Sequence, residues 1–92
     1  MSDVRVECSA AASGWLASVS VTDRASTRRY EVHVSAAELA RFAPGATDPT
    51  DLVRRSFAFL LAREPMESIL PAFDLSVIGR YFPEYERTIK AG

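Results

Sequence analysis

Prolines divide the C-terminal half of the chain into short segments, and this division constrains the fold more than any other feature. All five prolines follow residue 43, and residues 52–85 carry four of the five phenylalanines. A proline lacks a backbone donor and disfavours helical geometry at the residue before it. Each segment therefore has room for a short helix only. Short helices that meet at prolines are expected to wrap around a core rather than extend from it.

The first third of the chain alternates between apolar and polar residues, which is typical of strands with one buried face. The alternation covers residues 15–22 and 29–34. The polar segment from Asp23 to Thr27 between them has the length of a hairpin loop. Residues 4–8 alternate in the same way and predict an optional third strand. An isolated hairpin is marginally stable in water, so this sheet must pack against the helices.

The clearest helix signal is the sequence Ser35-Ala-Ala-Glu38, a capping box. It predicts a helix that begins at Ala36 and ends before Pro44. Asp48 and Pro49 predict the start of the main helix, by capping and by fixed backbone geometry respectively. Its apolar stripe consists of Leu52, Val53, Phe57, Leu60 and Leu61.

After the main helix, the pattern predicts three shorter pieces. Residues 65–70 have room for one or two helical turns, and Asp74 is expected to cap a helical run that ends before Pro83. Pro83 can itself begin a last helix. The predicted fold is α+β: an N-terminal antiparallel β-hairpin or three-stranded meander packed against several short C-terminal helices. We expect one domain over residues 1–92, with strands in about 1–35 and helices in 36–90. The predicted core contains Val19, Val32, Val34, Phe57, Leu60, Leu61, Ile69, Leu75 and Ile78.

Composition and charge argue against several classes of function. The formal net charge is -1, which gives no overall attraction to nucleic acid or to anionic membranes. The single cysteine, Cys8, allows no intrachain disulfide and suits a reducing compartment. The longest apolar run, residues 57–62, is far shorter than a membrane span. We therefore expect a cytoplasmic protein that does not contact membranes.

No pattern of residues predicts catalysis, a metal or a cofactor. The only histidine, His33, could meet Cys8 if strands 4–8 and 29–34 were neighbours. A solvent-facing histidine and a small buried cysteine explain both residues without chemistry. One His and one Cys are too few for a zinc site, and the four glycines form no phosphate-binding loop. We expect no enzymatic activity, although a small enzyme without a recognisable site stays an alternative.

A DNA-binding alternative comes from the order of elements. A strand over 29–34, a helix over 35–42 and a helix over 49–63 resemble the strand-helix-helix order of ribbon-helix-helix repressors and antitoxins. In that family two chains pair their strands and insert them into the major groove, which would aim Arg29 and His33 at the bases. Glu31 in the middle of the reading face counts against this reading. The basic footprint of such binders is also absent.

The aromatic residues near the C-terminus are the candidate contact surface. Phe59 lies at the margin of the main helix's apolar stripe, and Tyr81 and Tyr85 lie on either side of Pro83. Partly exposed rings beside arginines are common in protein interfaces. With Arg55 and Arg80, these rings form the predicted interaction surface, for a protein partner or a second copy. The alternative is that the rings cover the core.

Three blocks in residues 52–86 resemble a group of small bacterial proteins without an assigned activity. The blocks are residues 56–61 (SFAFLL), 67–70 (ESIL) and 73–86 (FDLSVIGRYFPEYE). The resemblance implies a bacterial cytosolic domain and carries over no catalytic or binding residue. Pro71 and Ala72 stand where charged residues are expected, which argues against a continuous helix there. The leading prediction is a small non-enzymatic interaction or accessory protein.

Overall fold

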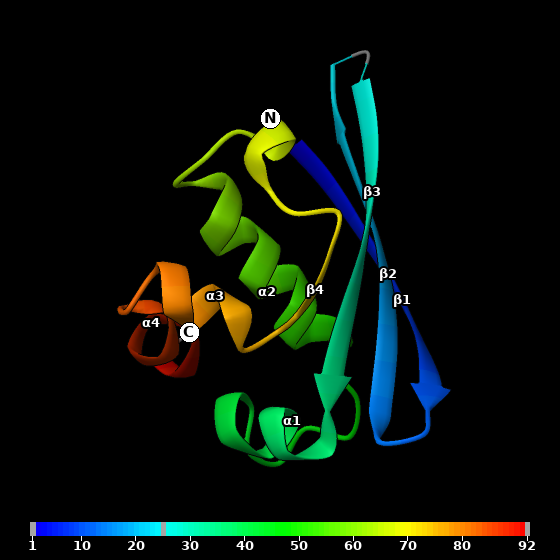
Figure 1. Ribbon diagram of the computed structural model, residues 1–92, viewed down its shortest axis with the longest axis vertical. Helices are drawn as coiled ribbons and strands as arrows, with labels where there is room; N and C mark the ends of the chain where they lie inside the picture. Colours follow the sequence, from blue (N-terminus) through cyan, green and yellow to red (C-terminus); the bar gives the residue numbers. More distant parts are fainter. Residues whose placement is uncertain (1, 25, 92) are drawn as a thin grey trace.

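The N-terminal strands form an antiparallel meander, and the helices lie on one of its faces (Figure 1). The computed structural model describes residues 2–24 and 26–91. In chain order the elements are β1 (Ser2–Ala11), β2 (Gly14–Asp23), β3 (Ser26–Ser35), α1 (Ala36–Phe42), α2 (Thr50–Leu61), the 3-10 helix η1 (Met66–Ser68), β4 (Ala72–Asp74), α3 (Val77–Tyr81) and α4 (Tyr85–Ala91). The predicted α+β class is confirmed.

The meander is longer and more regular than the alternation predicted. β1 pairs with β2 from Ser2 opposite Asp23 to Ala11 opposite Gly14, so the optional third strand is confirmed. The β2–β3 ladder likewise continues up to the hairpin tip, where Asp23 lies opposite Ser26. The predicted loop is therefore shorter than expected, and its Ala25 lies outside the described residues.

A fourth strand, β4, was not predicted. It pairs with β3 in parallel, with Phe73 opposite Val32. The Glu31 N–H donates to the Pro71 carbonyl (2.8 Å), and the Leu75 N–H donates to the His33 carbonyl (3.0 Å). The expectation that Asp74 caps a helix is wrong, because α3 begins at Val77. Pairing with the free edge of a distant strand outweighs a local capping preference.

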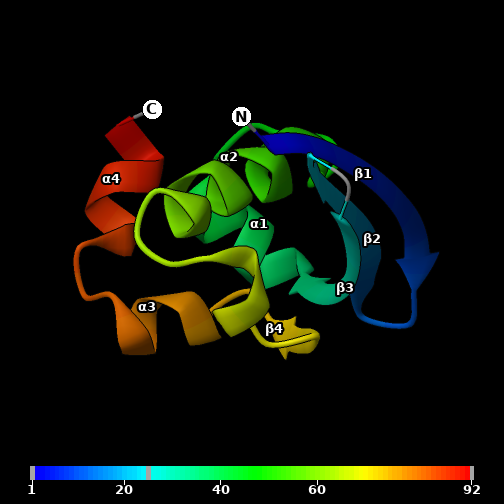
Figure 2. The same ribbon diagram turned by 90° about the horizontal axis from the view of Figure 1, so that it is seen from above.

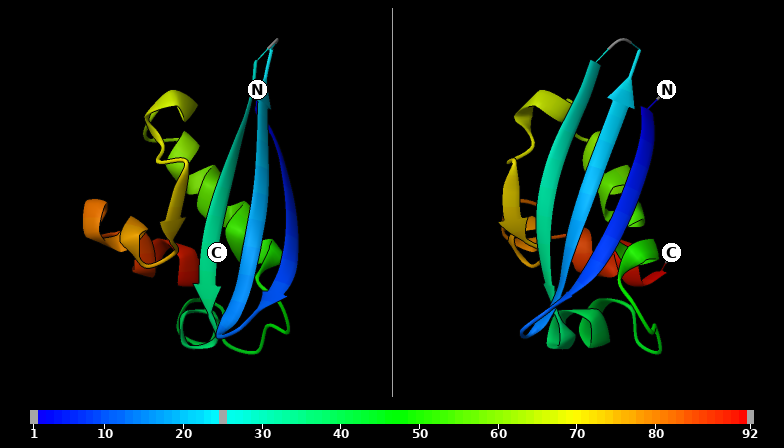
Figure 3. Two further views of the ribbon diagram at one scale, coloured as in Figure 1. Left: turned by 45° about the vertical axis from the view of Figure 1, so that its right-hand side comes forward. Right: turned by 90° about the vertical axis from the view of Figure 1, so that its right-hand side faces the viewer.

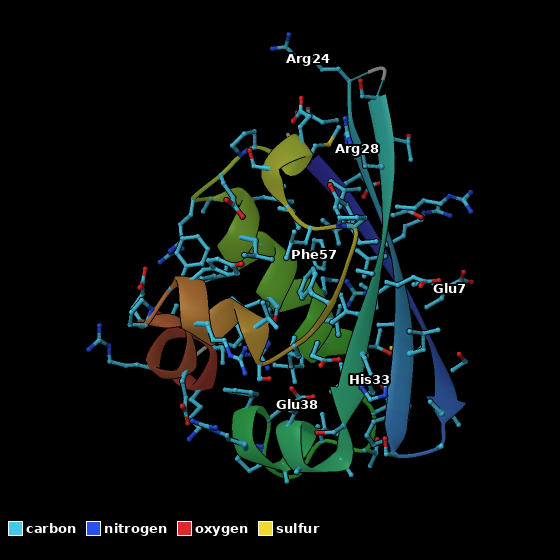
Figure 4. All side chains as sticks on the ribbon, in the orientation of Figure 1. Glu7, Arg24, Arg28, His33, Glu38 and Phe57 are labelled. Atoms are coloured by element: carbon cyan, nitrogen blue, oxygen red, sulfur yellow. The ribbon has the colours of Figure 1, made fainter. Side chains whose placement is uncertain are left out.

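The core lies between the sheet and the helices (Figure 2). Ala17, Val21, Val32 and Val34 have no exposed surface, as the alternation requires for one face of the sheet. Phe57 reaches from α2 towards the sheet (Figure 4), and its ring lies 5.2 Å from that of Tyr30. All the predicted core residues are buried except Leu61, which is half-buried and packs against the core.

The other face of the meander is polar, and none of the described helices covers it (Figure 3, right). Because side chains alternate along a strand, Arg5 and Glu7 of β1 share this face with Arg29 and Glu31 of β3. All four side chains are exposed. We call this the outer face of the sheet.

The predicted capping box is confirmed and does more than cap α1. The Glu38 N–H donates to Ser35 Oγ (3.0 Å), and the Ser35 N–H donates to Glu38 Oε1 (2.8 Å). Oε2 of Glu38 accepts from the Ser76 N–H (2.9 Å), just before α3. Burial raises the pKa of Glu38, but these hydrogen bonds outweigh burial and hold it below its usual value. One carboxylate therefore joins the starts of two helices.

Candidate contact groove

The structure places two of the predicted surface rings in the interior. Phe59 is 6% exposed and Tyr85 has no exposed surface, so the expectation that they form a contact surface is wrong. The Phe59 ring packs edge-on against Tyr85 (5.3 Å) and Phe82 (5.7 Å). The Arg63 guanidinium covers the ring at 3.6 Å. The reason is that α4 packs against a second side of α2, so residues at the margin of the sheet-facing stripe are buried too.

Tyr85 is held by a buried hydrogen bond to α2. Its hydroxyl lies 2.7 Å from Ser56 Oγ, which donates to the Leu52 carbonyl at 2.7 Å. Burial raises the pKa of Tyr85 to about 12, against a smaller lowering by the Ser56 hydrogen bond. The Tyr85 phenol is uncharged, and Ser56 and Leu52 in its hydrogen-bond chain are buried as well, so Tyr85 has a structural role.

The two predicted arginines have different surroundings. Arg55 donates to Asp51 (2.9 Å) and to the Ile89 carbonyl (2.7 Å), so it joins α2 to the last turn of α4. Arg80 is exposed and, together with Gly79 and Pro83, lines a separate depression beside α3. The structure therefore does not gather the five predicted residues into one surface.

Of the three rings predicted to form the contact surface, Tyr81 is the exposed one, at 68%. It lines an apolar groove. The groove has a volume of about 340 Å³ and lies between the segment that joins η1 to β4 and helix α3. Its apolar lining consists of Leu60, Ile69, Leu70, Phe73, Val77, Ile78, Tyr81 and Phe82. Leu60, Ile69 and Ile78 are buried and form the floor, whereas Leu70 is 47% exposed.

Backbone hydrogen bonds hold both walls of the groove. The first wall follows the Pro71 carbonyl, which accepts from Glu31 of β3, and continues into β4. The second wall is α3, anchored by buried Ile78 and by the bond from the Ser76 N–H to Glu38. Hydrogen bonds to the rest of the fold therefore position both walls, which favours a preformed binding site.

The groove has little polar lining. Glu64 and Ser68 are its polar residues, and Glu64 is the ionisable one apart from the Tyr81 phenol. The preceding residue, Arg63, forms an ion pair with Glu84 instead, with 3.2 Å between Arg63 Nε and Glu84 Oε2. In the described part of the chain, Glu64 takes part in no ion pair. A ligand in the groove would meet an apolar surface with one free carboxylate at its border.

The Cys8–His33 pair is contradicted by the sheet order. Strand β2 separates β1 from β3, and the registers place Cys8 on the helix-covered face and His33 on the outer face. The Thr50 hydroxyl lies 3.5 Å from Cys8 Sγ. His33 Nδ1 instead lies 3.7 Å from an oxygen of Asp74, longer than a hydrogen bond. Neither residue is paired with a nucleophile or base in the arrangement that catalysis requires.

The strand-helix-helix alternative also loses its geometric basis. A ribbon-helix-helix dimer pairs the two copies of one strand, so that strand needs a free edge. β3 pairs with β2 along its whole length on one side and with β4 over residues 31–33 on the other.

Within residues 2–24 and 26–91, no three His, Cys, Asp or Glu residues lie close enough to hold a metal ion. None of the helices described is long and apolar enough to cross a membrane.

Comparisons of the chain with protein-family models, with curated proteins and with solved structures found no match. The resemblance of residues 52–86 to small bacterial proteins therefore stays a prediction.

Sequence reasoning missed Leu70 and Phe73 as groove residues. The available signal was the pair of apolar residues on either side of Pro71, in a segment too short to bury both.

Proposed function

We propose that this chain is a small non-enzymatic interaction protein of the bacterial cytosol, which binds a segment of a partner protein in the groove beside α3. One observation carries the proposal. Leu70 and Tyr81 are the exposed large apolar side chains of the described residues, and both line the same groove. Exposed apolar side chains that gather in one place are characteristic of interaction sites. The lone cysteine, which suits a reducing compartment, and the resemblance described above support the cytosolic part of the proposal.

The groove chemistry favours a peptide segment with an apolar anchor beside a lysine or arginine. Its volume of about 340 Å³ is near the lower end of the roughly 300–1,000 Å³ range of ligand clefts. Small-molecule sites usually add several convergent polar groups that fix the ligand's orientation. This groove offers Glu64 and Ser68 only. An apolar anchor would fill the groove, and a neighbouring cation would pair with Glu64.

Selection from a random peptide library tests the proposal. We expect enriched peptides to share apolar anchors next to Lys or Arg, and to bind the parent chain in the micromolar range by fluorescence anisotropy. Tyr81→Ser and Leu70→Ser should each weaken that binding by roughly tenfold or more, as loss of a central apolar contact does. Glu64→Lys should reverse the charge preference of the selected peptides.

The matched control is Leu16→Ser, which removes a half-buried leucine from the outer face of the sheet. It should leave peptide binding unchanged. Equal binding by the parent and both groove variants, or no enrichment at all, would refute the proposal. Duplex DNA titrated at low and high salt is the counter-probe, since phosphate contacts make binding steeply salt-dependent. Such salt-dependent DNA binding would favour the DNA-binding alternative.

A further inference from the structure

Strand β1 forms a long unpaired edge of the sheet. The sheet order is β1-β2-β3-β4, so its two edges are β1 and the three-residue strand β4. β1 has ten residues, contains no proline, and pairs with β2 without a bulge from Ser2 to Ala11. Outside that ladder, no backbone hydrogen bond between described residues reaches 2–11. Proteins usually protect such an edge with prolines, bulges, short strands or charged side chains, because it can pair with another chain, and of these β1 has the charges alone.

The side chains of β1 form two chemically different rows. Val4, Val6 and Cys8 face the helices and are only half-buried, although they pack against the core. Arg5 and Glu7 are exposed on the outer face, where Glu7 points away from the helices (Figure 4). A strand added to this edge would extend the apolar row and the charged row together, because neighbouring strands keep side chains in register.

The order of charges along β1 selects one register for a second copy. With the two strands antiparallel and Val6 opposite Val6, Arg5 of each copy lies opposite Glu7 of the other. Residues 2–10 then pair without a like-charge contact. Moving the centre to residue 5 places Arg5 opposite Arg5, and moving it to residue 7 places Glu7 opposite Glu7. Like charges directly opposite each other destabilise a strand pair. Centres at Val4 and Cys8 also avoid this conflict, but they pair only residues 2–6 and 5–11 of β1, so the Val6 register is the longest one without a like-charge contact.

We propose that two copies of this chain pair through β1, antiparallel, with Val6 on the two-fold axis. The two meanders then form one continuous sheet, and each copy contributes the same surface, as a two-fold interface requires. The charges that repel in the neighbouring registers attract in this one. β1 and β4 are opposite edges of the sheet, so the groove beside β4 stays open in both copies.

Charge exchange at the edge tests the proposal. Sedimentation equilibrium of the parent chain should show a monomer–dimer equilibrium. Arg5→Glu places two carboxylates opposite each other in both pairs of the dimer, and Glu7→Arg places two guanidinium groups opposite each other. Each variant should raise the dimer dissociation constant by roughly tenfold or more, because two attractive pairs become repulsive. An equimolar mixture of the two variants should form the mixed dimer, in which every pair is again opposite in charge.

The double variant R5E/E7R is the matched control. It restores both opposite-charge pairs within a homodimer, so its dissociation constant should return close to that of the parent. Both side chains are exposed and make none of the ion pairs found in the described chain, so the variants should keep the parent's circular dichroism and Tm. A parent that stays monomeric at millimolar concentration would overturn the proposal. So would a dimer that neither single variant weakens, or variants that do not recombine.

Discussion

Ser56→Ala should destabilise the protein more than Tyr85→Phe does, although both remove the same hydrogen bond. Ser56 has one hydroxyl proton, and the Leu52 carbonyl can only accept, so that proton goes to Leu52 (2.7 Å). The Tyr85 hydroxyl must therefore donate to Ser56 Oγ (2.7 Å). The direction of this bond decides which substitution leaves a buried donor without a partner.

The magnitudes follow from that asymmetry. Ser56→Ala leaves the Tyr85 O–H unsatisfied where the residue has no exposed surface, which costs about 1–3 kcal/mol. Tyr85→Phe keeps the Ser56–Leu52 bond and removes one donor, which costs about 0.5–1.5 kcal/mol. Alanine also favours helix over serine by about 0.5 kcal/mol, so the measured loss for Ser56→Ala understates the cost of the stranded hydroxyl.

Urea unfolding of the parent, the two single variants and the double variant at pH 7, followed by circular dichroism, measures these free energies. The double variant removes both partners, so its loss should be smaller than the sum of the single losses, and the coupling should be about 0.5–3 kcal/mol. Additive losses would refute the reasoning, and so would a Tyr85→Phe variant that is the less stable of the two.

Further predictions concern the core, the capping box, the pH dependence and the second face of α2. Leu60→Ala should cost about 2–5 kcal/mol, measured by urea unfolding, because it leaves a cavity beneath the groove. Ser35→Ala should cost about 1 kcal/mol while Ser35→Thr should not, and equal Tm values would place the start of α1 elsewhere. The unfolded chain releases the Tyr85 proton near pH 10 and the folded chain near 12, so the parent should lose about 1.4 kcal/mol per pH unit between these values, and Tyr85→Phe should lose less. Phe59→Ser should destabilise the protein by about 3–5 kcal/mol, and a Tm equal to the parent's would mean that this ring is exposed rather than buried.

Features set by neighbouring residues were predictable from the sequence, and those set by distant pairing were not. The capping box joins residues three apart, and the meander joins strands that follow one another, so local patterns were sufficient for both. β4 was missed because its partner, β3, lies about forty residues earlier, and three residues carry no periodicity.

The site was predictable only in part, for the same reason. Tyr81 was correctly expected to be exposed. Phe59 and Tyr85 were misplaced because α4 covers a second side of α2, and their contacts join residues far apart in the chain. A helix's apolar stripe indicates how much of its surface is buried, but it does not say whether one element or two bury it.

The parallel pairing of β4 with β3 also has a consequence for the order of folding. Hairpins between successive strands close short loops. Pairing of β4 with β3 closes a much longer loop, because α1, α2 and η1 lie between them in the chain. We expect the meander to form early and β4 to dock late. Since β4 and the segment before it make one wall of the groove, that wall would be among the first parts to open in local unfolding. A bound partner segment should then slow amide exchange at Glu31 and Leu75, whose N–H groups donate across the β3–β4 contact, more than it slows exchange of the amides that pair within the β1–β2 and β2–β3 ladders.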